Sequence, residues 1–100
     1  MRRRIIFDTE ARREFEDAVV WYNRQQPGLG DRFEAEIHAT FLRILANPEK
    51  YRSVSHNIRQ VKVEIFNKYS VYFRLERDFI GIVSVFHGAR NPEELHRRLK

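Results

Sequence analysis

Apolar residues recur at helical spacing twice in the first half of the chain. The first stripe predicts an amphipathic helix over residues 10–25 and consists of Ala11, Phe15, Ala18, Val19 and Tyr22. The second predicts a helix over residues 30–46 and consists of Phe33, Ile37, Phe41, Ile44 and Leu45. Pro27 and Gly28 separate the stripes, since proline cannot continue a helix. We expect the two helices to pack as an antiparallel hairpin.

Strand patterns lie on both sides of this hairpin. Residues 5–7 are β-branched or aromatic and predict a short strand, and Asp8 or Thr9 is the expected cap of the helix that follows. After a polar loop over residues 49–57, apolar and polar positions alternate over residues 60–65 and again over 69–76, as in half-buried strands. Residues 80–86 are almost wholly apolar, which is typical of a central strand covered on both faces.

The short breaks between these last three strands favour an antiparallel meander. A final helix is expected over residues 93–99, with Pro92 in its first turn. The order therefore predicts an α+β fold: strand, two-helix antiparallel hairpin, three-stranded antiparallel meander and short C-terminal helix, with the helices on one face of the sheet. One hundred residues form a single domain, 1–100, and 13% aromatic residues favour a packed core.

The composition also narrows the cellular setting. No apolar run approaches the roughly 18 residues of a membrane span. Only three apolar residues separate the N-terminal arginines from Asp8, so no secretion signal is expected. The chain has no cysteine, which fits a reducing compartment. We therefore expect a cytoplasmic protein that does not interact with membranes.

The net charge of +5 lies entirely in the second half. Residues 1–50 hold nine Lys or Arg and nine Asp or Glu, whereas residues 51–100 hold ten and five. This asymmetry favours an anionic partner, either nucleic acid or an acidic protein segment. A basic surface without a specific partner is the alternative. The four histidines stand far apart in sequence, so we expect no metal site and no cofactor.

Five cationic or imidazole side chains fall on or beside the predicted meander: Arg59, Lys62, Arg74, His87 and Arg90. Lys62 and Arg74 occupy the polar side of their strands and are expected to share the sheet face away from the hairpin. Clustered cations can hold a phosphodiester, and a histidine can accept and donate protons because its ordinary pKa is close to neutral pH. Tyr72 and Phe86 are the candidate stacking surfaces beside them.

The alternative for Lys62 and Arg74 is cross-strand ion pairing, with Glu76 and Glu64 respectively. Val20 and Trp21 lie off the main apolar stripe of the first helix. Either they are half-exposed and suited to a protein partner, or they pack on the edge of the hairpin.

Several segments resemble, in order, those of one bacterial toxin superfamily. They are Trp21-Tyr22, Pro27-Gly28-Leu29-Gly30-Asp31-Arg32-Phe33, Ile44-Leu45-Ala46-Asn47-Pro48, Tyr51, Phe66-Asn67-Lys68-Tyr69-Ser70-Val71-Tyr72-Phe73-Arg74 and Val85-Phe86-His87-Gly88-Ala89-Arg90-Asn91-Pro92. Together they are similar to the RelE/ParE superfamily of type II toxin–antitoxin modules, and more to its ParE, or plasmid stabilisation, branch. The resemblance implies a toxin that forms a hetero-oligomer with a cognate antitoxin, which neutralises it.

The resemblance implies two alternative activities. ParE-like members poison DNA gyrase, whereas RelE-like members are endoribonucleases that cut mRNA on the ribosome. Lys62 and Arg90 match cations of the nucleases, but Ser70 stands where they carry an arginine, and no tyrosine follows Pro92. The gyrase activity is therefore favoured, the endoribonuclease is the alternative, and a member that binds antitoxin without toxicity is a third possibility.

Each of the two activities has its own candidate residues. If the chain is a nuclease, the candidate catalytic residues are Lys62, Arg74, His87 and Arg90. If it poisons gyrase, the candidate target-binding residues are Arg59, Arg90, Arg97 and Arg98. Val20 and Trp21 are the candidates for antitoxin binding. The run Arg2-Arg3-Arg4 could belong to the edge of the first strand, to target binding or to neither.

Overall fold

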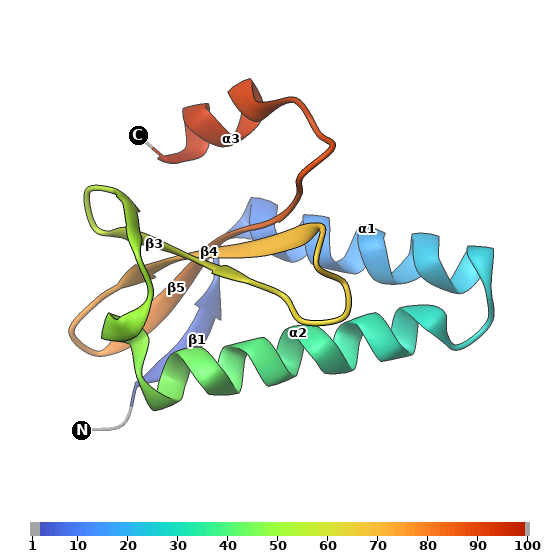
Figure 1. Cartoon of the computed structure of the whole chain (residues 1–100), viewed down its shortest axis with the longest axis horizontal. Helices are drawn as coiled ribbons and strands as arrows, with labels where there is room; N and C mark the ends of the chain where they lie inside the picture. Colours follow the sequence, from blue (N-terminus) through green and yellow to red (C-terminus); the bar gives the residue numbers. More distant parts are fainter. Residues whose placement is uncertain (1–2, 100) are drawn as a thin grey trace.

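A computed structural model describes residues 3–99, and its elements follow the predicted order (Figure 1). The bounds are β1 Arg4–Phe7, α1 Thr9–Gln25, α2 Leu29–Ala46, the 3-10 turn η1 Pro48–Lys50, β2 Ser53–Ser55, β3 Ile58–Lys62, β4 Tyr69–Leu75, β5 Phe79–His87 and α3 Pro92–Leu99. Each helix begins one residue before the predicted start. The α+β class and the helix hairpin are confirmed.

The strands form one sheet in the order β1-β5-β4-β3-β2. β3, β4 and β5 are successive antiparallel neighbours, so the meander is confirmed. β1 pairs in parallel with β5, with Ile5 opposite Ile80 and Phe7 opposite Ile82. This pairing places the N-terminal strand at one edge and covers β5 on both sides within the sheet.

The main core lies between the hairpin and the sheet. Among its fully buried side chains are Phe33, Ile37 and Ile44 from α2 and Phe73 and Ile80 from the strands. Burial of large apolar side chains is worth about 1.5–3 kcal/mol each. This core therefore fixes the hairpin against one face of the sheet.

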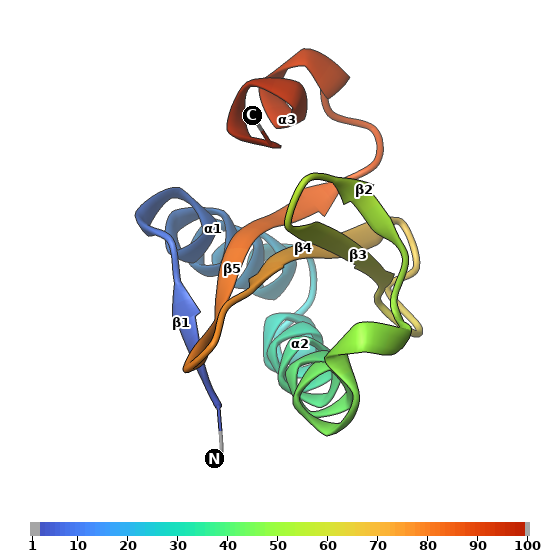
Figure 2. The ribbon, with the colours of Figure 1, turned by 90° about the vertical axis from the view of Figure 1, so that its left-hand side faces the viewer.

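A smaller cluster occupies the opposite face of the sheet. Tyr72, Val83 and Phe86 pack there against Leu95 of α3. Figure 2 shows α3 across the sheet from α2. The prediction that all helices share one face is therefore wrong for α3, because its single buried side chain, Leu95, has its apolar partners on the other face.

Local expectations fail at three further points. The strand predicted over residues 60–65 runs from Ile58 to Lys62, because Ile65 adopts a positive φ of 69° and is 68% exposed. The polar loop contains η1 and β2, which are three residues each. Asp8 stands at the start of α1 but makes no capping hydrogen bond, since its carboxylate binds Arg74.

The N-terminal arginines are only partly described. Arg3 Nε donates a hydrogen bond to the carbonyl oxygen of Glu76 at 2.8 Å. Arg4 opens β1 opposite Phe79, and Arg2 lies outside the described residues. Within residues 3–99, no helix combines the length and the apolar character that crossing a bilayer requires.

Candidate functional site

The edge of β5 becomes free where β1 ends, and α1 supplies a carboxylate there. Phe7 is the last residue of β1 paired with β5, opposite Ile82. Beyond it, the backbone N–H of Val85 donates to Glu14 Oε1 at 3.1 Å. The hydroxyl of Ser84 donates to the same oxygen at 2.9 Å. Glu14 therefore satisfies strand groups that β1 is too short to reach.

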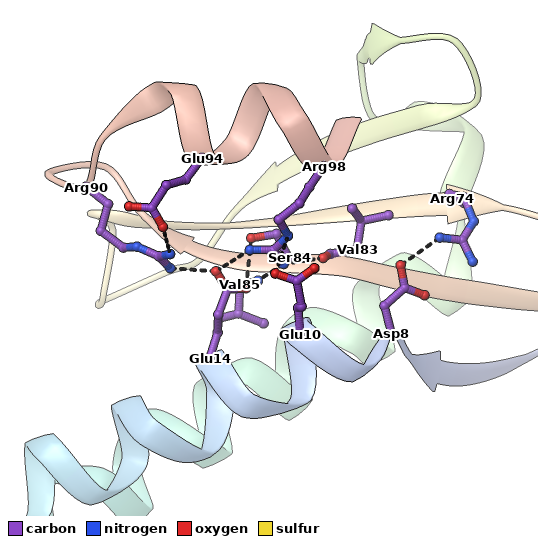
Figure 3. Close-up of polar contacts among 10 residues, drawn as sticks. All are labelled: Asp8, Glu10, Glu14, Arg74, Val83, Ser84, Val85, Arg90, Glu94 and Arg98. Atoms are coloured by element: carbon purple, nitrogen blue, oxygen red, sulfur yellow. Dashed lines mark hydrogen bonds and ion pairs between the residues drawn. The ribbon is translucent and has the colours of Figure 1, made fainter. Parts of the chain in front are cut away.

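Two arginines converge on this carboxylate (Figure 3). Arg98 Nη1 and Nη2 donate to Glu14 Oε2 and Oε1 at 2.7 and 2.9 Å, and Nη2 also donates to the carbonyl oxygen of Val83 at 2.6 Å. Arg90 donates to Glu14 Oε2 through one nitrogen and to Glu94 at 2.6 Å through the other. Such forked pairs are among the strongest hydrogen bonds in proteins.

We call Glu14, Ser84, Arg90, Glu94 and Arg98 the Glu14 cluster. The side chains of Glu14 and Arg98 retain only 11% and 13% exposure. Burial by itself would raise the pKa of Glu14, but hydrogen bonds from Arg98 and Arg90 outweigh it, and the pKa lies below its usual value. The carboxylate is therefore charged at neutral pH and holds α3 against α1 and β5.

Sequence reasoning missed Glu14. A signal was present, because Glu14 follows Ala11 by three residues and precedes Ala18 by four, and both alanines belong to the buried stripe. A helical position with those neighbours borders the buried face. A carboxylate there, in a chain with excess arginine, is a candidate for a buried ion pair.

The predicted group of cations is dispersed over the molecule. Lys62 and Arg74 share the sheet face away from the hairpin, but they lie at opposite ends of the β3–β4 ladder, opposite Ser70 and Ile58 respectively. His87 instead lies beside Tyr69, whose ring packs against the main core. Arg59 Nη1 donates to the carbonyl oxygens of residues 49 and 51 at 3.1 and 2.7 Å, which anchors the loop before β2.

Ion pairing occupies Arg74. Its Nη1 donates to Asp8 Oδ2 at 2.8 Å, and its Nε lies 3.4 Å from Glu76 Oε2. Of the two alternative pairs, neither Lys62 with Glu76 nor Arg74 with Glu64 forms among residues 3–99. The charge of Arg74 therefore serves to tie β4 to the start of α1.

A cleft between α1 and α3 adjoins the Glu14 cluster. Trp21, His87 and Arg97 line it, together with Tyr69. His87 Nδ1 accepts a hydrogen bond from the N–H of Ala89 at 2.9 Å, and its ring meets that of Tyr69 edge-on at 4.9 Å. Burial, together with Tyr22, raises the pKa of Tyr69 to about 12, so its phenol is protonated at neutral pH.

The candidate target and antitoxin residues differ in accessibility. Arg90 and Arg98 are engaged with Glu14, whereas Arg97 is exposed on α3. Val20 and Trp21 are 49% and 55% exposed, so the half-exposed alternative is the one realised. The ring of Trp21 meets that of Tyr22 edge-on at 5.1 Å. Within residues 3–99, no three His, Asp or Glu side chains gather as metal ligands.

Comparisons with known proteins show which family this chain resembles. Residues 5–92 match the family model of the ParE toxin of the type II toxin–antitoxin system, parDE. A search of curated protein sequences found no match. Among solved structures, the chromosomal ParDE toxin–antitoxin system from P. aeruginosa is similar, with a TM-score of 0.73 and 13% identity over 86% of this chain and 96% of that chain. At that identity the likeness supports the fold alone. The ParE branch predicted from the residues is confirmed, and the chain belongs to the ParE toxin family of type II toxin–antitoxin systems.

Proposed function

We propose that this chain inhibits bacterial growth by poisoning DNA gyrase through protein contact, and that a cognate antitoxin neutralises it. The observation that carries the proposal is the match to the ParE toxin family over residues 5–92. The dispersal of the nuclease candidates supports it. Lys62 and His87 lie on different faces of the sheet, and Arg74 and Arg90 are each bound by two carboxylates. A phosphoryl-transfer site needs such groups around one phosphate.

The location of the target contact is inferred from which of the candidate arginines are exposed. Arg98 is almost buried, so it is a positioning residue for α3 in this proposal. Arg97 is exposed beside the cleft and presents its charge to a partner. We therefore assign target contact to Arg97, where α3 borders the cleft.

Induction of the chain in a bacterial host is expected to stop incorporation of labelled thymidine before that of labelled methionine. Lys62→Ala keeps this effect if gyrase is the target, because Lys62 lies on the sheet face away from the hairpin and does not line the cleft that Arg97 lines. Arg97→Glu weakens growth inhibition, and Arg77→Glu, an equal charge change on an exposed turn, leaves it unchanged. Earlier loss of methionine incorporation, abolished by Lys62→Ala, would instead establish the ribosome-dependent endoribonuclease.

Antitoxin binding is expected to depend on Trp21. A half-exposed tryptophan is the kind of side chain that dominates interface energies, often by 2 kcal/mol or more. Trp21→Ala should weaken the complex with the antitoxin of its own module by roughly 30-fold, as measured by isothermal titration calorimetry. The control is Leu42→Ala, since Leu42 is 68% exposed on α2. Equal losses in both variants would move the antitoxin surface elsewhere.

A further inference from the structure

β1 is the last strand on one side of the sheet. Within residues 3–99 it pairs with β5 and with no other strand, so its outer edge is open. Figure 2 shows β1 at the margin of the ribbon. Open edges invite pairing with another chain unless proline, a bulge or charge blocks them. β1 contains no proline, keeps an unbroken register with β5, and has one charged residue, Arg4, at its first position.

The backbone groups that face outward belong to Ile5 and Phe7. The N–H of Asp8 donates to the carbonyl oxygen of Ile82 at 2.9 Å, so the backbone of Asp8 faces β5. The direction of these groups alternates along a strand. Ile6 therefore also faces β5, whereas Ile5 and Phe7 offer their N–H and C=O groups to an added strand.

Apolar side chains border the open edge on both faces of the sheet. On the hairpin face, Ile5 and Phe7 line a groove with Leu42 and Leu45 of α2, and Leu42 is 68% exposed. On the other face, Ile6 is 40% exposed. A strand that fits this edge therefore carries apolar side chains on both of its faces, as β1 itself does.

We propose that β1 pairs with β1 of a second copy of this chain, antiparallel, around a two-fold axis at Ile6. In this register Ile5 of each chain is opposite Phe7 of the other, so the outward N–H and C=O groups bond one another. Ile6 packs against its own copy. The contact uses the same edge of both chains, so it closes at two copies. The proposal does not depend on gyrase as the target.

Charge complementarity favours this register and this partner. Arg4 of each chain lies opposite Asp8 of the other, on the face that carries Ile6. The Asp8 side chain binds Arg74 but keeps 37% exposure, so a second cation has access to it. An axis at Ile5 or Phe7 would instead place Arg4 or Asp8, respectively, opposite Ile6. A foreign strand could use the same backbone groups, but only a copy of β1 brings this pairing of charges with it.

The dimer is expected to be weak, since interfaces that bury less than about 1,200 Å² are mostly transient. Sedimentation velocity of the full chain between about 5 and 500 μM should show conversion of monomer to dimer. Arg4→Glu should raise the dimer dissociation constant at least tenfold, because it puts two carboxylates opposite each other. Arg24→Glu, an equal charge change on an exposed residue in the last turn of α1, should change it less than twofold.

Introduced thiols test the register, since the chain has no cysteine. Ile6→Cys would place two thiols at a non-hydrogen-bonded pair, whose Cα atoms lie about 4.5 Å apart, within disulfide range. Mild oxidation should therefore link this variant as a dimer on a non-reducing gel. Arg4→Cys is the matched control on the same exposed face. Its two thiols would be about 14 Å apart along the strands, so they should link at least tenfold more slowly.

Equal linking rates in the two cysteine variants would mean random collision and would overturn the proposal. So would a chain that stays monomeric at the highest concentration, or equal effects of Arg4→Glu and Arg24→Glu. Arg4→Glu that leaves self-association unchanged but weakens the antitoxin complex would assign the edge to the antitoxin instead. Each variant, with its thiol reduced, should keep the original melting temperature, which separates lost pairing from lost folding.

Discussion

Glu14→Ala is expected to lower the free energy of unfolding by about 3 kcal/mol, because it leaves the nearly buried guanidinium of Arg98 without its carboxylate partner. Arg98 would keep its bond to the carbonyl oxygen of Val83 but lose both bonds to the carboxylate. The N–H of Val85 would also lose its acceptor. The damage should concentrate in α3, since the cluster is its main polar attachment. Urea denaturation measures the total, and amide hydrogen exchange of residues 92–99 measures the local part.

Glu10→Ala is the matched control for this prediction. Glu10 lies one helical turn earlier, its side chain is 71% exposed, and its carboxylate is 3.9 Å from Arg98 Nε. Exposed pairs of this kind contribute less than about 1 kcal/mol. Equal effects of the two substitutions would show that α3 is held by its apolar contacts and not by Glu14.

The Glu14 cluster is also expected to make the stability of the α3 attachment depend on pH. A carboxyl whose folded pKa lies below its unfolded value contributes stability above the unfolded value and loses it as pH falls through the folded one. The pKa of Glu14 is lowered in this way. Exchange of the α3 amides should therefore accelerate below about pH 4, near the unfolded pKa of glutamate. Glu14→Gln should remove that part of the acid response.

Local pattern was enough to predict most elements of this fold, because α1 and α2 each bury one face at helical spacing and β5 is a continuous apolar run. The parallel pairing of β1 with β5 depends on contacts more than 70 residues apart in sequence. Nothing in residues 4–7 encodes which strand they join. β2 is three residues long and gives too few positions to show a period.

The site was harder to predict because the alternation of side chains between the two sheet faces shifts by one residue within the apolar strand β5. Tyr72 is opposite Ser84, yet Phe73 is opposite Ile82, so Val83 is an extra residue of the kind found at β-bulges. This shift directs Val83 to the α3 face and allows Ser84 to reach Glu14. In a run where every residue is buried, polarity does not reveal such a shift.

The candidate cations were likewise predicted only in part from the sequence. The positions of Lys62 and Arg74 on one sheet face follow from alternation and were predicted. Their separation follows from the register of β3 and β4, with Lys62 opposite Ser70 at one end and Arg74 opposite Ile58 at the other. Sequence patterns identified the charged side chains but not which carboxylate each one meets.

Gly30→Ala is expected to destabilise the protein by about 2–3 kcal/mol, the reverse of the usual effect in a helix. Alanine normally exceeds glycine there by about 0.5–1 kcal/mol. A Cβ at Gly30, however, would lie 2.1 Å from the carbonyl oxygen of Val19 and 2.6 Å from the side chain of Asn23. The N–H of Gly30 already donates to Asn23 Oδ1 at 2.7 Å, so the backbone of α2 at Gly30 lies directly against α1.

Thermal unfolding tests this prediction, and the loss corresponds to a fall of roughly 10–20 °C in Tm. Gly28→Asn is the control for backbone strain without a clash, because Gly28 has a positive φ of 89° and nothing lies within 4 Å of its Cβ position. Asparagine visits this region more readily than most residues, so the loss should be about 1 kcal/mol, less than that of Gly30→Ala. Since α1 carries both Glu14 and Trp21, separation of the hairpin should also loosen α3 and weaken antitoxin binding. A Gly30→Ala chain that melts at the original temperature or above would mean that the helices are not held together at this contact.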